Sequence, residues 1–108
     1  EAEIEQIAEL LFREVRERFG APRLSLLPIG AYEPRWFMKP MHMNPEDAVM
    51  AHLDLESRTS LAIHHGTIQL TNEAIDQPLK DLAAALEKLD VLQDDFLAPD
   101  IGECLSIL

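Results

Sequence analysis

Four histidines are the side chains of this sequence best suited to chemistry near neutral pH, because an imidazole both exchanges protons and binds zinc. His64 and His65 end an apolar run at 60–64 that is typical of a buried strand, and Gly66 permits a sharp turn after them. Ligands in layered α/β folds gather at the carboxyl ends of strands, so His64 is a candidate metal ligand. Residue type and spacing alone favour the alternative, a histidine hydrogen-bonded in a core or on the surface. Both histidines cannot bind one metal from regular strand geometry, since adjacent side chains point to opposite faces.

The segment 30–44 is predicted to be an irregular loop with several large side chains. His42 lies just before a predicted helix, and it is either a general acid or substrate contact, or a loop histidine that caps or packs. Tyr32, Trp36 and Phe37 could line a substrate pocket or belong to the core. Arg35 could meet a phosphate or carboxylate, although an open loop would leave it solvated.

The elements that must position these residues alternate along the chain. Asn44 and Pro45 are typical of a helix start, and His52 on that helix is expected to be a partly buried structural residue. Apolar spacing predicts three helices, at 2–19, at 45–56 and after Pro78. Short apolar runs predict four strands, at 23–29, 60–64, 96–98 and 103–107. This order indicates an α/β fold, with helices covering a sheet.

Composition excludes several classes of function. The 108 residues suit one small domain or part of a larger one. A formal net charge of −11 repels polyanions, so we expect no nucleic-acid partner. The one cysteine rules out an internal disulfide and favours a reducing compartment, so we expect a cytoplasmic location.

Catalytic metal patterns are absent from the sequence. A catalytic zinc needs three or more protein ligands and an open position. The chain has no His-x-His-x-Asp-His, His-Glu-x-x-His or Cys-x-x-Cys pattern, and no phosphate-binding glycine-rich loop. These residues alone therefore lack a complete catalytic constellation.

Three stretches nevertheless resemble a known family. They are LPIGAYEPRWFMK at 27–39 followed by His42, NPEDA at 44–48, and AIHHGT at 62–67. Together they resemble the C-terminal part of the metallo-β-lactamase-fold zinc hydrolases. They are most similar to the N-acyl-phosphatidylethanolamine-hydrolysing phospholipase D group and its bacterial relatives. The resemblance covers roughly residues 19–104 and fades over 1–18.

The resemblance implies a fold and a set of site residues. The fold would be the C-terminal half of an αβ/βα sandwich, with about three helices on a small mixed sheet and residues 1–108 as a single partial domain. Two zinc ions would belong to the complete protein, and none would be bound by this fragment alone. His64 would be a zinc ligand and His42 would act on substrate or in proton transfer. The substrate-binding residues would be Tyr32, Trp36, Phe37 and His65, the last standing where tryptophan is usual.

The implied function is that of the C-terminal portion of a zinc-dependent hydrolase. The complete protein would act on a lipid-like phosphodiester or related ester, with membrane contact left open, and the fragment would be inactive because the family's main metal motif lies upstream. A missing N-terminal half or a homo-oligomer would cover its exposed apolar surface. The alternative is a non-catalytic acidic α/β module that self-associates. A His-x-His-x-Asp-His motif encoded upstream in the same reading frame would separate the two.

Overall fold

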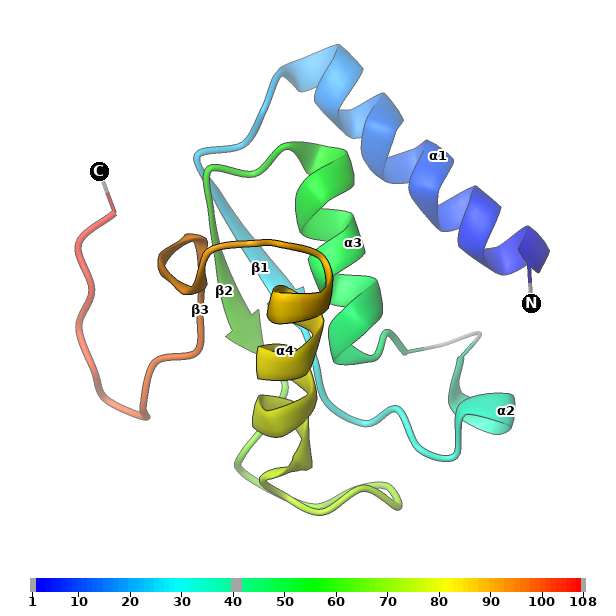
Figure 1. The fold of residues 1–108 in the computed structure, drawn as a ribbon, viewed down its shortest axis with the longest axis vertical. Helices are drawn as coiled ribbons and strands as arrows, with labels where there is room; N and C mark the ends of the chain where they lie inside the picture. Colours follow the sequence, from blue (N-terminus) through cyan, green and yellow to red (C-terminus); the bar gives the residue numbers. More distant parts are fainter. Residues whose placement is uncertain (1, 40–41, 108) are drawn as a thin grey trace.

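The computed structural model describes residues 2–39 and 42–107, and Figure 1 shows helices lying against a small sheet. The three predicted helices are confirmed as α1 (Ala2–Phe19), α3 (Pro45–Leu55) and α4 (Gln77–Lys88). Three of the four predicted strands are confirmed as β1 (Leu24–Pro28), β2 (Thr59–Ile63) and β3 (Phe96–Leu97), the last preceded by the 3-10 turn η1 (Gln93–Asp95). A short helix that was not predicted, α2 (Arg35–Met38), lies in the loop between β1 and α3.

The sheet has the order β1–β2–β3, and both pairings are parallel. Leu26 is opposite Leu61, and beyond the end of β1 the N–H of Ile29 still donates to the carbonyl of Ile63 at 3.0 Å. The α/β class is therefore confirmed, with one difference from the expected mixed sheet. The described part of the C-terminal segment forms no strand at 103–107, so nothing there adds an antiparallel edge.

Helix α3 is central, because it packs against β1, α1 and α4. Its start is fixed as predicted: the Asn44 side chain accepts from the Asp47 N–H at 2.8 Å, and the Asp47 carboxylate accepts from the Asn44 N–H at 3.2 Å. Its buried face meets the inner face of the sheet and α4. The resulting core consists of Leu27, Ile29, Ala48, Val49, Ala51, Leu55, Ala62, Leu82, Ala85, Leu86 and Phe96.

Helix α1 has the predicted length, and Phe12 on it packs against the core. Leu11 and Val15, which recur at helical spacing in an apolar stripe along this helix, are exposed. Two ion pairs connect this helix with the end of α3, from Arg13 to Asp54 at 3.6 Å and from Arg16 to Glu56 at 3.3 Å. The apolar spacing thus predicted the helix correctly, but it did not predict which side of α1 packs against α3.

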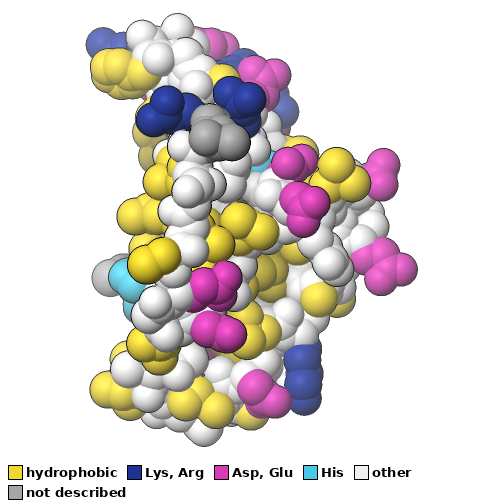
Figure 2. All heavy atoms as spheres, turned by 90° about the vertical axis from the view of Figure 1, so that its left-hand side faces the viewer, with side chains coloured by type: hydrophobic (Ala, Val, Ile, Leu, Met, Phe, Trp, Pro, Cys, Tyr) yellow, Lys and Arg dark blue, Asp and Glu magenta, His cyan; other side chains and the backbone are white. Residues whose placement is uncertain are grey.

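The outer face of the sheet carries exposed apolar side chains. Along β1, Leu27 is buried in the core, while Leu24 and Leu26 on the opposite face are 39 % and 55 % exposed. Figure 2 shows hydrophobic side chains gathering across the middle of the side where β3 and the C-terminal segment lie. Parallel sheets are usually covered on both faces, and here one face is covered by described residues. Within the described ranges, no helix is long and apolar enough to cross a membrane.

Candidate functional site

His64 is the first residue after β2, at the carboxyl end of the parallel sheet. Its backbone turns there with φ 59°, in the left-handed region, and its side chain is exposed. None of the described residues forms a hydrogen bond with its ring. The sequence prediction placed His64 at a strand end, and this position leaves an imidazole nitrogen available to a ligand.

The backbone of Gly30 packs closely against the backbone of His64. Gly30 follows β1 as His64 follows β2, and a Cβ added to Gly30 would lie 1.9 Å from the His64 carbonyl oxygen. Only glycine fits such an approach. The carboxyl ends of β1 and β2 are therefore held against one another, which fixes the direction in which His64 leaves the sheet.

A small cavity of about 40 Å³ lies between the two loops that follow these strands. It has room for water but not for a lipid headgroup. His65 lies at this cavity, and its buried Nδ1 has no hydrogen-bond partner among the described residues. Burial lowers the pKa of His65, and the Ala62 carbonyl partly opposes that effect. The cavity is lined by Gly30, Ala31, His64, His65, Gly66, Ile68, Gln69, Leu70, Glu73, Ala74, Ile75 and Pro78.

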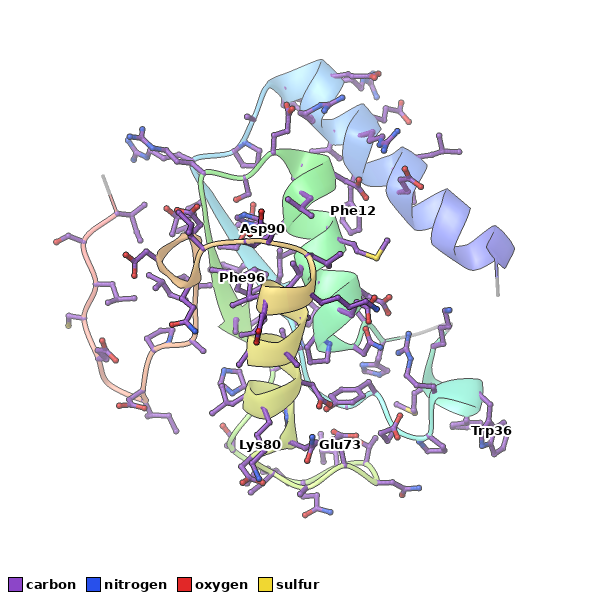
Figure 3. All side chains as sticks on the ribbon, in the orientation of Figure 1. Phe12, Trp36, Glu73, Lys80, Asp90 and Phe96 are labelled. Atoms are coloured by element: carbon purple, nitrogen blue, oxygen red, sulfur yellow. The ribbon has the colours of Figure 1, made fainter. Side chains whose placement is uncertain are left out.

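Glu73 ties the two loops together, and sequence reasoning missed it. Its Oε2 accepts from the Ala31 N–H at 3.0 Å, its Oε1 accepts from the Glu33 N–H at 2.9 Å, and the Thr71 hydroxyl donates to the same carboxylate. Figure 3 shows Glu73 in the loop below α4. Burial acts to raise the pKa of Glu73, but the bonds from Thr71, Glu33 and Ala31 outweigh it and lower the pKa. No sequence pattern marked Glu73, because its main partners are backbone amides some 40 residues away.

Tyr32 lies between these two amides, and its ring is buried. Its hydroxyl donates to the Asp81 carboxylate on α4. Burial raises its pKa, and Asp81 raises it further through the hydrogen bond and its charge, as do the charges of Glu73 and Glu33. Tyr32 also lines an open groove of about 400 Å³ whose wall includes the carboxylates of Glu33, Glu73 and Asp81. This groove disfavours an anion, so a role for Tyr32 in substrate binding stays a prediction.

Arg35 fixes the segment that carries His42. Its guanidinium donates to the His42 carbonyl oxygen at 3.0 Å and to the Asp47 carboxylate at 2.6 Å. Of the two alternatives for Arg35, contact with a carboxylate is confirmed and solvation in an open loop is wrong, because the guanidinium reaches back to Asp47 at the start of α3. The His42 N–H also donates to the Met38 carbonyl oxygen at 2.9 Å. His42 is half-buried, and its predicted role in catalysis stays a prediction.

Trp36 and Phe37 lie on α2, with their rings edge to face and their centroids 5.7 Å apart. Both are exposed, at 80 % and 64 %. Figure 3 shows Trp36 on α2, to the right of the loop that carries Glu73. The structure thus brings His64 and His65 to one cavity, whereas Trp36, Phe37 and His42 are not among its described lining residues. Their predicted roles toward substrate remain predictions.

His52 is confirmed as a structural histidine. It is buried, and its Nδ1 lies 2.7 Å from the Ser60 hydroxyl oxygen. Ser60 donates to Ser57, and Ser57 donates to the Thr59 carbonyl oxygen, so the Nδ1–H of His52 donates to Ser60. Burial lowers the pKa of His52, while the charge of Asp95 acts to raise it.

The donor set matches a metal only in part. His64 fits zinc as one donor, since zinc accepts imidazole nitrogen and this ring is exposed at a fixed strand end. Among residues 2–39 and 42–107, no three histidine, cysteine, aspartate or glutamate side chains come together as a metal-binding group. The assignment of His64 as a metal ligand therefore stays a prediction, and a zinc site would need further donors.

Comparison with known proteins gives a consistent result. A model of the family described as the β-lactamase superfamily domain matches residues 7–65. The chain is 40 % identical over 94 residues to N-acyl-phosphatidylethanolamine-hydrolyzing phospholipase D 1 of Caenorhabditis elegans, covering 85 % of this chain and 26 % of that protein. It is 37 % identical over 99 residues to the mitochondrial N-acyl-phosphatidylethanolamine-hydrolyzing phospholipase D of Saccharomyces cerevisiae, covering 89 % and 21 %. An uncharacterised protein of Mycobacterium tuberculosis is 40 % identical over 79 residues, covering 70 % and 21 %. The chain thus spans about a quarter or less of the length of these relatives.

Proposed function

Because the chain belongs to the β-lactamase superfamily domain family, whose hydrolases have the metallo-β-lactamase fold, we propose that it forms part of a zinc-dependent hydrolase. The substrate we propose is a phosphodiester or related ester of a lipid-like molecule. Membership of this family implies metal use in general, and the names of the phospholipase D relatives support a lipid substrate. Zinc as the metal, with two ions in the whole protein, is the specific form of the proposal.

The observation that carries the proposal is the placement of His64. An exposed imidazole stands at the carboxyl end of a parallel strand, beside a cavity, on a backbone that Gly30 holds in place. An ordinary structural histidine is hydrogen-bonded and buried, as His52 is. His64 is exposed, and no described residue forms a hydrogen bond with its ring, which supports its assignment as one metal donor.

Each side chain then has a defined task. When bound, zinc supplies Lewis-acid stabilisation of the reacting phosphate and lowers the pKa of an attacking water. His64 would hold one ion through a ring nitrogen, while His42, fixed through its backbone by Arg35, would bind substrate or transfer a proton. The substrate-binding surface would be provided by Tyr32, Trp36, Phe37 and His65, with the Tyr32 hydroxyl held by the Asp81 carboxylate.

Residues 2–39 and 42–107 do not bring together enough donors to complete this site. We propose that the remaining donors come from residues outside 1–108, and that these residues by themselves are inactive. We further propose a cytoplasmic protein, with contact at a membrane surface where a lipid substrate requires it, and no nucleic-acid partner. Association with a second copy of this chain, or with residues outside 1–108, would cover Leu24 and Leu26 on the outer sheet face.

The test uses the full-length product of the gene and its hydrolysis of N-acyl-phosphatidylethanolamine in phosphatidylcholine vesicles. We expect zinc-dependent release of phosphatidic acid, lowered by about 100-fold or more in His64→Ala and in His42→Ala. Lys80→Ala, an exposed change on α4, is the control and should keep wild-type activity. A protein that releases no product at any zinc concentration yet self-associates would support the non-catalytic module instead.

A further inference from the structure

The two loops at the carboxyl end of the sheet are joined by one side chain. Residues 30–33 follow β1 and residues 64–76 follow β2, so they are independent in the sequence. Glu73 comes from the second loop, and its carboxylate receives two backbone N–H groups of the first, from Ala31 at 3.0 Å and Glu33 at 2.9 Å. The Asn72 N–H adds a bond to the Glu33 carbonyl oxygen at 3.2 Å.

The chemistry of this contact requires a charged carboxylate. Two amides converge on its two oxygens, and the Thr71 hydroxyl donates to it as well. Bonds from amides to an ionised carboxylate are stronger than bonds between neutral groups. An amide side chain of the same shape could accept from only one of the two N–H groups, and its own NH₂ would face the other donor. Ala31 also has φ 63°, a conformation that a residue with a Cβ adopts only when its surroundings hold it there.

The position of the contact links it to His64. Glu73, Gly30, Ala31 and His64 all line the 40 Å³ cavity, and Gly30 touches the His64 carbonyl. If the Ala31 amide lost its bond to Glu73, the backbone at Ala31 and at the neighbouring Gly30 could move. The close contact between Gly30 and the His64 carbonyl would then no longer hold His64 in one position.

We propose that Glu73 is a positioning residue of the site, and that its ionised carboxylate fixes the loop after β1 against the loop after β2 and thereby sets His64 for its ligand. This inference rests on the proposed function, in which His64 donates to zinc. Glu73 itself touches neither metal nor substrate in this role. It acts through Ala31 and Gly30.

The experiment compares variants of the full-length protein by hydrogen exchange and by zinc affinity. Glu73→Gln removes the charge and keeps the shape. Thr71→Val removes the hydroxyl donor and leaves both amide bonds in place. It replaces Glu73→Gln as the test variant if Glu73→Gln does not fold. Glu103→Gln is the matched control, because Glu103 also accepts a backbone N–H, from Asp100 at 2.9 Å, but does so locally in the C-terminal segment.

We expect Glu73→Gln to speed exchange of the Ala31 and Glu33 amides by about tenfold or more. The zinc dissociation constant, measured by chelator competition, should rise by about tenfold, with a smaller rise for Thr71→Val and none for Glu103→Gln. Faster exchange with zinc affinity within about twofold of wild type would overturn the inference, since Glu73 would then serve stability alone. Unchanged exchange would overturn it too. If the wild-type protein binds no zinc, both the proposed function and this inference are wrong. If the wild-type and Glu73→Gln proteins bind zinc equally well, only this inference is wrong.

Discussion

The histidines show how one residue type takes different roles in different surroundings. His52 is buried and donates to Ser60, His65 is partly buried with one ring nitrogen unpartnered among described residues, and His64 is exposed at a strand end. Desolvation disfavours the charged imidazole, so the pKa of both His52 and His65 is lowered. The structural role of His52 and the ligand role proposed for His64 therefore follow from burial and bonding, which the sequence could indicate only by position.

His52 makes stability depend on pH in a defined direction. Its folded pKa lies below the ordinary 6.5, so on acidification the unfolded chain takes up the proton first. The free energy of unfolding should therefore fall as the pH drops from 6.5 through the folded pKa, and the His52 contribution should be fully present above 6.5. Denaturant titrations between about pH 7 and about pH 5 measure this slope.

Two variants separate this effect from the other groups that titrate. His52→Asn should reduce the slope, because asparagine does not titrate, and the lowered pKa of His65 should leave a smaller slope of the same sign. Ser60→Ala should lower stability but keep the slope, since the imidazole is still buried. An unchanged slope in His52→Asn would show that another group is responsible.

Elements were predicted well where the signal is local. Asn44 and Pro45 gave the start of α3, and apolar spacing gave α1 and α4. Helix α2 has four residues, too few for a period to appear. The strand expected at 103–107 was wrong because an apolar run becomes a strand only with a partner to bond, and the sequence does not say whether one is near.

The candidate site was predicted less completely than the fold. The strand-end position of His64 is visible in the sequence, because it depends on neighbouring residues. The Glu73 contact joins segments about 40 residues apart, and the Arg35 contact with His42 depends on the loop folding back. Both depend on three-dimensional proximity to backbone groups, for which residue type gives no pattern.

The ends of β1 and β2 give an element-scale prediction at Gly30. Gly30→Ala should lower the free energy of unfolding by about 2–3 kcal/mol, because the new Cβ has to displace the His64 carbonyl, which it would meet at 1.9 Å. Gly20→Ala is the comparison: its φ of +82° costs about 1 kcal/mol for a residue with a Cβ, but the space there is open. Urea denaturation of the two variants measures the difference, and an equal or smaller loss at Gly30 would contradict the close packing of the strand ends.

At the scale of the whole molecule, three properties belong together. The parallel sheet is covered on one face by described residues and presents Leu24 and Leu26 on the other. Among the described residues, no three histidine, cysteine, aspartate or glutamate side chains gather as a metal-binding group, and His64 is the one exposed histidine at a strand end. The chain spans about a quarter or less of its phospholipase D relatives. Each property is consistent with a site completed by a further part of the protein, which is the function proposed above.

In the completed protein, His64 is proposed to donate an imidazole nitrogen to zinc. The most direct measurement is the number of zinc ions per chain in the full-length protein and in its His64→Ala variant, after equilibration with a zinc buffer. We predict about two ions in the wild type and about one in His64→Ala, as a site shared between two metals loses the ion that depends on this ligand. Two ions retained by His64→Ala with unchanged affinity, or no zinc in the wild type, would contradict the account.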